Sequence, residues 1–580
     1  MRKDKDKDYP PLPSLPIQNT YPEQITQFAF QLTRKTPSDL KKVSYQLNDL
    51  LISLKNALFI SDDTDKINQY IHYYILLYKL IAHTRDIFVG KGERDLTYMM
   101  IYVWYTQFPI LGIHILHLLS DKKSYPFGCW KDIKYFCNYV KENSPKNTND
   151  SIIETCVNIL NQQLIKDLLN EKKENEKKEN EKKEKISLVS KWIPREKSKQ
   201  FGWLFDKCAI QWSKIMYPEY YYFATTKPSI SFQNKIKREY RKNVSNLNRQ
   251  LDTVQIKQCE NRWSHIKINT ITENTKQKQL NVLLNQDMYG YVRRQTEDRN
   301  ICRENLISHL FYEYETPQTQ QQQQQTQQQT YKKEIYSSFQ MKELIKEIEF
   351  AYTIESMERI NYNWDKVKGN ILQKTENIIP ILDLTTTNYT NALSISIMLS
   401  EISKIQNKIL VYDQIPVWVN FSETKSLFEK VKQVQEIKNS KQVETSNIFT
   451  ALELLILSII NTNMSPEDVT NLVLCIVSDF STPIKELQLH IHYFFHKNGY
   501  SKPPHIIYWN VSLYQNNYYP CNAFTTRTLM ISGTSSSCFQ FLNDPIWKEY
   551  TPYTYLCNIL GQERYHELEK YFLDLTLSQT

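Results

Sequence analysis

The strongest constraint on the fold is a set of five short apolar runs in the last third of the chain. They are rich in β-branched residues and read NIIPILDL, KILVYD, NLVLCIVSDF, HIIYWNVS and TLMISGT. Segments with helical amphipathic patterning lie between them, such as NALSISIMLSEIS, NIFTALELLILSII and IKELQLHIHYFFH. Continuous apolar strands that alternate with helices are typical of a parallel sheet covered on both faces. The sequence therefore predicts a doubly wound α/β domain over residues 377–580.

The chain before these runs has a different hydrophobic period. Apolar residues recur there at helical spacing, as in INQYIHYYILLYKLIAHT. We expect residues 23–376 to form an all-α, HEAT-like array of stacked helix pairs after a disordered lead over residues 1–22. Two low-complexity insertions interrupt this region. Residues 171–185 repeat Glu, Lys and Asn and would form a solvated helix or a flexible loop, and the glutamine-rich residues 318–330 are expected to be disordered.

One uncharged stretch is long enough to span a bilayer. It runs from Tyr98 to Leu119, and Pro109 would divide it. Two histidines and a glutamine inside it also argue against a lipid environment. We expect a buried pair of core helices here and no membrane partner.

Motif content argues against most enzyme classes. The chain of 580 residues has 10 glycines and contains no G-x-G-x-x-G, G-x-x-x-x-G-K-[ST], G-x-S-x-G or H-E-x-x-H. No nucleophile is paired with a base, so we predict a non-enzymatic protein without a small-molecule substrate. The ten cysteines form no C-x-x-C, and the first residues are charged and not apolar like a secretory signal. These features favour reduced thiols and a location in the cytoplasm. If the source is a large DNA virus, the location would be the host cytoplasm or the virion.

Charge is distributed unevenly along the chain. Residues from Asn377 onward hold 14 Lys and Arg against 18 Asp and Glu, whereas the preceding part holds 58 against 45. This permits a nucleic-acid partner for the helical part only. In the densest basic segment, KIKREYRKNVSNLNR, Tyr240 is interleaved as an aromatic that would stack on RNA bases, the alternative being a solvated helix face. The candidate RNA-binding residues are Lys235, Lys237, Arg238, Arg241, Lys242 and Arg249.

Two carboxylates follow predicted strands of the α/β domain. Asp383 ends NIIPILD and Asp479 ends NLVLCIVSD, and ligands of such sheets bind outside the carboxyl ends of the strands. Thr385 and Thr387 complete a D-x-T-x-T sequence, which is a suitable oxygen set for Mg²⁺. The alternative is a hydroxyl-rich turn in which Asp383 accepts backbone N–H bonds and no ion binds.

The D-x-T-x-T sequence, the later loop ETSNIFTALEL and the Ser-Asp after NLVLCIV resemble the metal-ion-dependent adhesion site of von Willebrand factor type A domains. The resemblance implies Mg²⁺ ligands and a protein ligand that binds through the cation. This chain departs from the usual Asp-x-Ser-Gly-Ser pattern because threonines replace the serines and the glycine. The implied metal set is Asp383, Thr385, Thr387, Ser446 and Asp479.

A wider resemblance covers roughly residues 75–560. The segments IAHTRDIFVGKGERDLTYMMIYVW, FGCWKDI, ISLVSKWIP and PPHIIYWNVS followed by LMISGTS are similar to an uncharacterised family of plants, protists, bacteria and large DNA viruses. That family pairs a helical-repeat region with a type A domain, as Ro/TROVE RNA-binding proteins do. The resemblance implies a ribonucleoprotein-like binding protein. The alternatives are a protein–protein scaffold, virion-associated if viral, with a degenerate metal site, and a metal-dependent hydrolase that uses Asp383 and Asp479.

Two further segments allow a structural and a functional interpretation. In GKGERD, Gly90 and Gly92 would supply a tight interhelical turn, with ion pairs from Arg85, Asp86, Glu93, Arg94 and Asp95; alternatively Lys91 and Arg94 would face a phosphate. The H-x-H-x-x-x-H segment contains three histidines that either belong to one amphipathic helix or bind a transition metal. These three histidines are His490, His492 and His496.

Overall fold

A computed structural model describes most of the chain. The described residues are 20–120, 127–144, 150–176, 186–219, 230–287, 290–311, 341–348, 354–371, 376–421, 426–440, 445–481, 487–516 and 518–577. Most of the expected disordered lead and the whole glutamine-rich tract lie outside these residues. Part of the Glu-Lys-Asn repeat is described, and it is helical as far as Glu176.

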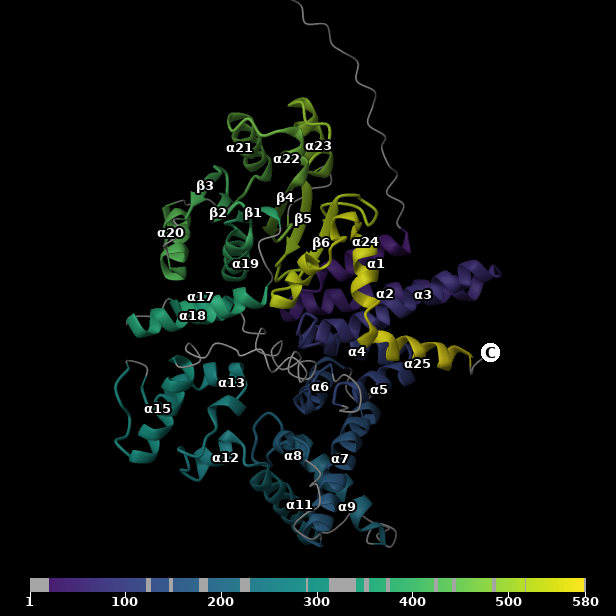
Figure 1. The fold of residues 1–580 in the computed structure, drawn as a ribbon. Helices are drawn as coiled ribbons and strands as arrows, with labels where there is room; N and C mark the ends of the chain where they lie inside the picture. Colours follow the sequence, from purple (N-terminus) through teal and green to yellow (C-terminus); the bar gives the residue numbers. More distant parts are fainter. Residues whose placement is uncertain are drawn as a thin grey trace, which may run out of the picture.

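The first part of the chain is helical, as predicted. Its helices share one continuous apolar core, which occupies the centre and the lower part of the molecule (Figure 1). The first helix starts at Tyr21, inside the expected lead. The helices of this part are α1 (Tyr21–Gln31), α2 (Pro37–Ile60), α3 (Thr64–Arg85), α4 (Asp95–Gln107), α5 (Pro109–Leu118), α6 (Trp130–Asn143), α7 (Asp150–Glu176), α8 (Val189–Trp192), α9 (Gly202–Met216) and α11 (Ile230–Leu251).

The uncharged stretch forms two buried helices, which confirms the sequence prediction. Helix α4 ends at Gln107 and α5 begins at Pro109, where proline is tolerated because the first N–H groups of a helix have no intrahelical partner. Trp104 and Leu116 are fully buried in the core of the helical part. Among the described residues, no helix is long and apolar enough to cross a membrane.

A small helical module follows α11 and has a core of its own (Figure 1, lower left). Trp263 and Leu283 are buried in this core, and the Arg299 guanidinium lies 3.7 Å from the centroid of the Trp263 ring. The elements of the module are α12 (Val254–Cys259), η1 (Ile268–Thr270), α13 (Glu273–Lys278), α14 (Leu280–Leu283) and α15 (Glu297–Phe311).

The last third of the chain contains a six-stranded sheet in the order β3-β2-β1-β4-β5-β6. All neighbouring strands are parallel except β3, which pairs antiparallel with β2 at the edge. The five predicted strands are confirmed, whereas β3 was not expected because only four residues form it and three of them are partly or fully exposed. The strands are β1 (Asn377–Asp383), β2 (Lys408–Tyr412), β3 (Val417–Asn420), β4 (Leu472–Ser478), β5 (His505–Asn510) and β6 (Thr528–Ser532).

Helices cover both faces of the sheet. Because side chains alternate along a strand, Ile378 and Leu382 of β1 join the core on one face, and Ile379 and Ile381 join the core on the other. The first face is covered by α17 (Met341–Ile348), α18 (Ile354–Asn370), α19 (Tyr389–Ile402) and α20 (Leu427–Ser440). The second face is covered by α21 (Ile448–Asn461), α22 (Pro466–Asn471) and α23 (Leu487–Lys497).

Residues from each side of the expected division between residues 376 and 377 contribute to hydrophobic cores on the other side. After β6 the chain continues through α24 (Pro552–Leu560) and α25 (His566–Leu577), which bring Leu560 and Leu568 into the core of the helical part. Conversely, Phe30 of α1 and Trp364 of α18 belong to the cores that cover the sheet. Figure 1 shows α24 and α25 beside α1 and α3.

The GKGERD segment is the tight turn between α3 and α4, which confirms the structural interpretation. Gly92 has a φ of 69°, and a Cβ on Gly90 would lie 2.0 Å from the carbonyl oxygen of His83. Of the five residues expected to form ion pairs, only Asp95 has none among the described residues. The pairs are Arg85–Asp132, Arg94–Asp132, Asp86–Arg564 and Glu93–Arg34.

Lys91 in this turn connects the helical part to the sheet. Its ammonium group donates to the carbonyl oxygens of Ala29 at 3.0 Å and Leu32 at 3.1 Å, at the end of α1. A third bond goes to the Ser532 hydroxyl at 2.6 Å, at the end of β6. Burial lowers the pKa of Lys91 to about 8. These three bonds use the three N–H donors, so the ammonium group does not serve a phosphate.

We predict that Lys91→Met lowers the free energy of unfolding by about 2–4 kcal/mol, because buried carbonyl oxygens would lose their donor. Denaturant unfolding of the full chain would measure the change. The control Lys41→Met removes an exposed lysine of α2 and should change stability by less than about 0.5 kcal/mol. An equal, small effect of both substitutions would contradict the role of Lys91.

Candidate functional site

The five residues of the predicted metal set come together at the carboxyl edge of the sheet. Asp383 ends β1 and Asp479 follows β4, and these two strands are parallel neighbours at the centre of the sheet. Adjacent parallel strands necessarily place the residues after their carboxyl ends side by side. The loop before α21 contributes Ser446, whose hydroxyl accepts a bond from the Thr385 hydroxyl at 3.2 Å.

Hydroxyl groups and one backbone N–H surround the Asp383 carboxylate. Its Oδ1 accepts bonds from the Thr385 N–H at 2.9 Å and the Thr385 hydroxyl at 2.7 Å. Its Oδ2 accepts bonds from the Ser478 hydroxyl at 2.7 Å and the Ser446 hydroxyl at 3.3 Å. Sequence reasoning noted Ser478 only as part of the Ser-Asp pair, yet it makes the shorter of the two bonds to Oδ2.

The Asp479 carboxylate is held by the loop after β1. Its Oδ2 accepts bonds from the Thr387 N–H at 2.7 Å and the Thr387 hydroxyl at 2.6 Å, and its Oδ1 accepts a bond from the Thr386 hydroxyl. Sequence reasoning gave Thr386 no role, yet its hydroxyl ties the two strand ends together.

The site concentrates negative charge in a buried position. Asp383 and Asp479 are each 5% exposed, and neither forms an ion pair in the described part of the chain. Burial raises the pKa of Asp383, and the charge of Asp479 raises it further, while bonds from Ser478 and Thr385 act in the opposite direction. A divalent cation would compensate this charge, and a donor set of oxygen atoms alone is the set that Mg²⁺ prefers. The residues present therefore fit Mg²⁺.

A lysine from the start of the chain lies near this site. Lys35 donates to the Thr33 hydroxyl at 2.9 Å and to the carbonyl oxygens of Ser512 at 3.1 Å and Tyr514 at 2.6 Å. Burial lowers the pKa of Lys35 to about 7, against the opposing influence of the Asp479 charge. No local sequence pattern links Lys35 to Asp479, so sequence reasoning could not find it.

Solvent reaches the site on the side of the loop after β1. Thr387 is exposed, and Thr385 and Ser446 are half-buried, whereas both carboxylates lie beneath them. A cation bound among the hydroxyl groups would therefore have an open side toward solvent.

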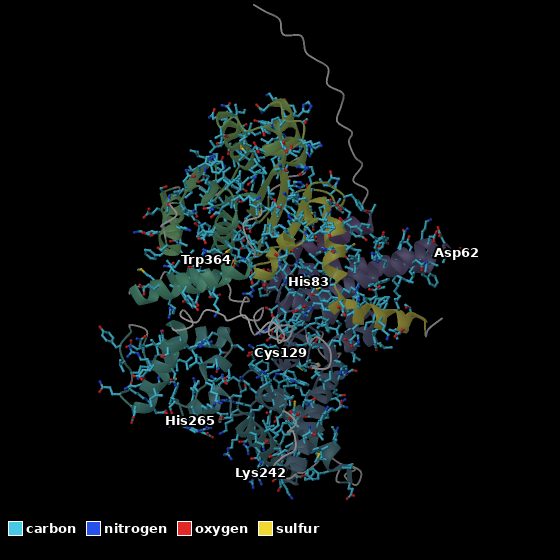
Figure 2. All side chains as sticks on the ribbon, in the orientation of Figure 1. Asp62, His83, Cys129, Lys242, His265 and Trp364 are labelled. Atoms are coloured by element: carbon cyan, nitrogen blue, oxygen red, sulfur yellow. The ribbon has the colours of Figure 1, made fainter. Side chains whose placement is uncertain are left out.

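The six candidate RNA-binding residues lie on α11 in the lower part of the molecule, where Figure 2 labels Lys242. Lys237 pairs with Asp206 at 2.7 Å and Arg241 pairs with Glu196 at 2.6 Å. The other four are exposed and form no ion pair within the described ranges; they are Lys235, Arg238, Lys242 and Arg249.

The expectation that Tyr240 stacks on RNA bases is wrong. Its side chain is 0% exposed, and its hydroxyl donates to Asn161 Oδ1 at 2.9 Å. The ring packs edge-on against Phe205, because the helical period turns it toward α9 while the basic residues face solvent.

The three histidines of the H-x-H-x-x-x-H segment lie on α23, as their spacing predicts. The His490 ring contacts the Phe449 ring, and His492 shares a hydrogen bond with Gln488 at 3.2 Å. In the part of the chain that the structure describes, no group of three or more His, Cys, Asp or Glu side chains is placed to hold a metal ion. The transition-metal interpretation has no support from this geometry.

Comparison with known proteins identifies one domain. Residues 379–551 match the model of a domain of unknown function, DUF7788. No curated protein matches the chain. The matched residues contain nearly all of the sheet and the five residues of the candidate site, so the site lies within the part of the chain that is similar to that domain.

We predict that Asp383→Asn changes how stability depends on pH. In the unfolded chain the Asp383 carboxyl releases its proton at pH values near 3.8. Because the pKa of Asp383 is raised in the native state, the folded protein keeps this proton to higher pH. The wild type should therefore lose stability relative to Asp383→Asn as pH rises above about 4, by about 1.4 kcal/mol for each unit by which the pKa is raised. Denaturant unfolding with a chelator present would measure this difference.

The matched control is Asp468→Asn, which changes an exposed aspartate of the same domain and should keep the pH dependence of the wild type. If the wild type instead gains stability relative to Asp383→Asn as pH rises, the pKa of Asp383 is lowered and the charge argument fails.

Proposed function

We propose that this protein is a non-enzymatic binding protein whose α/β domain takes a carboxylate of a protein ligand through Mg²⁺. The observation that carries the proposal is the convergence of Asp383, Asp479 and three hydroxyl residues at the carboxyl edge of β1 and β4. No nucleophile with a neighbouring base accompanies these residues in the described part of the site.

A type A-like domain and a HEAT-like helical part belong to this proposal. The resemblance of the D-x-T-x-T, Ser446 and Ser-Asp elements to an adhesion site is supported by the position of all three at one edge of the sheet. The sheet order and the single antiparallel edge strand are compatible with such a domain. The helical part supports the proposal only because it precedes the α/β domain in the chain, as in the architecture that the sequence resembles.

The residues of the site would divide the work of holding a cation. Asp383 and Asp479 supply the negative charge, and the hydroxyl groups of Thr385, Thr387 and Ser446 supply neutral oxygen ligands. When bound, Mg²⁺ would offer a positively charged contact to an incoming carboxylate. Thr387 lies at the exposed side, and the bonds that Thr386 and Thr387 donate to Asp479 hold the loop in register with β4.

We predict that the chelator-treated full chain binds Mg²⁺ or Mn²⁺ and that Asp383→Asn weakens this binding at least about tenfold. Isothermal titration calorimetry would measure both affinities. The control Asp468→Asn removes one exposed carboxylate from the same domain and should bind the cation as the wild type does.

Three outcomes would redirect the assignment. Equal cation binding by wild type and Asp383→Asn would show that the ion binds elsewhere. A protein partner bound equally well with a chelator present would favour a scaffold with a degenerate metal site. Turnover of a phosphoester or peptide substrate that requires Mg²⁺ and is lost in Asp383→Asn would favour a hydrolase.

We propose RNA binding by the helical part as a second function. The observation that favours it is the row of four exposed basic residues on α11 that form no ion pair with any described residue, at the opposite end of the molecule from the sheet (Figure 2). Basic residues on one helix face suit contact with a phosphate backbone. The burial of Tyr240 removes the stacking contact that the sequence suggested on this helix.

We predict that substituting Lys235, Arg238, Lys242 and Arg249 by Gln weakens RNA binding and reduces its salt dependence. The slope of log K against log salt should fall by about 0.7 for each phosphate group that the variant no longer binds. Filter binding across a salt series would measure it. A control with Lys41, Lys55, Lys497 and Lys502 changed to Gln removes the same charge elsewhere, and an equal loss in both variants would make the binding non-specific.

A further inference from the structure

A short hairpin in the small module presents an exposed strand. Gln286 and Val292 form an antiparallel bridge, and the Arg293 N–H donates to the Asn285 carbonyl at 2.8 Å. Asn285 is 0% exposed, so the hairpin is rooted in the core beside Leu283. Residues 290–296 are all exposed, and we call them the exposed strand, although Val292 is the one residue of this segment assigned to a β-bridge.

The exposed strand carries an aromatic ring that packs on no described ring. Tyr291 is 73% exposed, although tyrosine usually buries most of its ring in a folded protein. Its backbone is fixed, because its carbonyl accepts from the Asp287 N–H at 2.9 Å and its N–H donates to Asp287 Oδ1 at 2.9 Å. Arg293 and Arg294 follow Tyr291 by two and three residues.

Two arginines follow Tyr291 in the exposed strand. Arg293 and Arg294 are exposed and form no ion pair among the described residues. Burial lowers the pKa of the Arg299 guanidinium, and the charges of Arg294 and Arg293 lower it further, while Cys302 and the charge of Asp298 oppose the shift. Arg299 itself is engaged, because it lies on the Trp263 ring and donates to the Val282 carbonyl at 2.8 Å.

An exposed tyrosine beside unpaired arginines fits a specific ligand chemistry. Guanidinium groups bind phosphate oxygens through two parallel N–H bonds, and a free aromatic face stacks on a nucleobase. A base in a duplex offers only its edges, so stacking requires an unpaired base. We propose that the exposed strand binds single-stranded nucleic acid, with Tyr291 stacked on a base and Arg293 and Arg294 on the flanking phosphates.

The inference rests on the second proposed function and supplies the stacking residue that Tyr240 cannot provide. The module follows α11 directly, and the Arg262–Asp252 ion pair at 2.7 Å links residues on either side of α12. Figure 2 labels His265 of the module and Lys242 of α11 in the lower part of the molecule. An acidic protein segment would use the arginines without needing the ring, so its binding would not depend on Tyr291.

The experiment measures fluorescence anisotropy of labelled oligo(U) and oligo(dT) of about 20 nucleotides, and of an RNA duplex of about 20 base pairs, with the full chain. Tyr291→Ala should weaken binding to the single strands by roughly 5- to 100-fold, the range that loss of one stacked base gives, and Tyr291→Phe should restore it. Arg293→Gln with Arg294→Gln should lower the salt slope by about 1.4. Tyr493→Ala and Lys497→Gln with Lys502→Gln are matched controls, because Tyr493 is 54% exposed on α23.

The outcomes separate this inference from the function on which it rests. If the wild type binds, the α11 variant is weakened and the hairpin variants are not, RNA binding stands and this inference is wrong. If the wild type binds none of the three oligonucleotides, both fail. Duplex binding as tight as single-strand binding also overturns this inference. So does a result in which polyglutamate competes with the oligonucleotides and Tyr291→Ala leaves their binding unchanged. Tighter binding of oligo(U) than of oligo(dT) would support RNA as the ligand of the exposed strand. Equal binding would support contacts to groups that RNA and DNA share.

Discussion

The end of helix α1 joins the two parts of this protein. Its last carbonyl oxygens accept bonds from the Lys91 ammonium and from Ser532, and the Phe30 carbonyl accepts a bond from Asn510 at 2.8 Å. These bonds come from three different segments of the chain. They seat α1 against the carboxyl ends of β5 and β6, and Phe30 enters the core on one face of the sheet. The C-terminal helices α24 and α25 add to this connection by packing on α1 and α3.

This seating determines which part of the sheet edge is available for binding. Helix α1 covers the ends of β5 and β6, and the adjoining loop carries Lys35 toward Asp479. The ends of β1 and β4 stay accessible through Thr387, where the two carboxylates and the hydroxyl groups gather. The helical part therefore shapes the surroundings of the candidate cation site although it contributes none of the predicted ligands. The basic residues of α11 and the exposed strand at 290–296 belong to the helical part, away from the sheet (Figure 2).

Patterns local in the sequence predicted the elements well. Five of the six strands and the helices between them follow from hydrophobic period, and β3 was missed because four residues, most of them partly or fully exposed, give too weak a pattern. The position of Asp383 and Asp479 at the carboxyl edge followed from the rule for parallel sheets, whereas the pairing of β1 with β4 that makes them neighbours is known from the structure. The roles of Thr386 and Ser478 did not follow, because a hydroxyl group bonds whichever acceptor the tertiary structure brings to it.

The sequence by itself determined the two kinds of secondary structure, the order of the strands along the chain and the position of Asp383 and Asp479 at the carboxyl edge of the sheet. Each of these depends on residues within a few positions of one another or on a general rule of parallel sheets. Only the tertiary structure decided that Tyr291 is exposed and that Lys91 binds the end of α1. The reason is that burial and charge pairing depend on segments distant in the chain, and packing between them leaves no periodic trace in either segment.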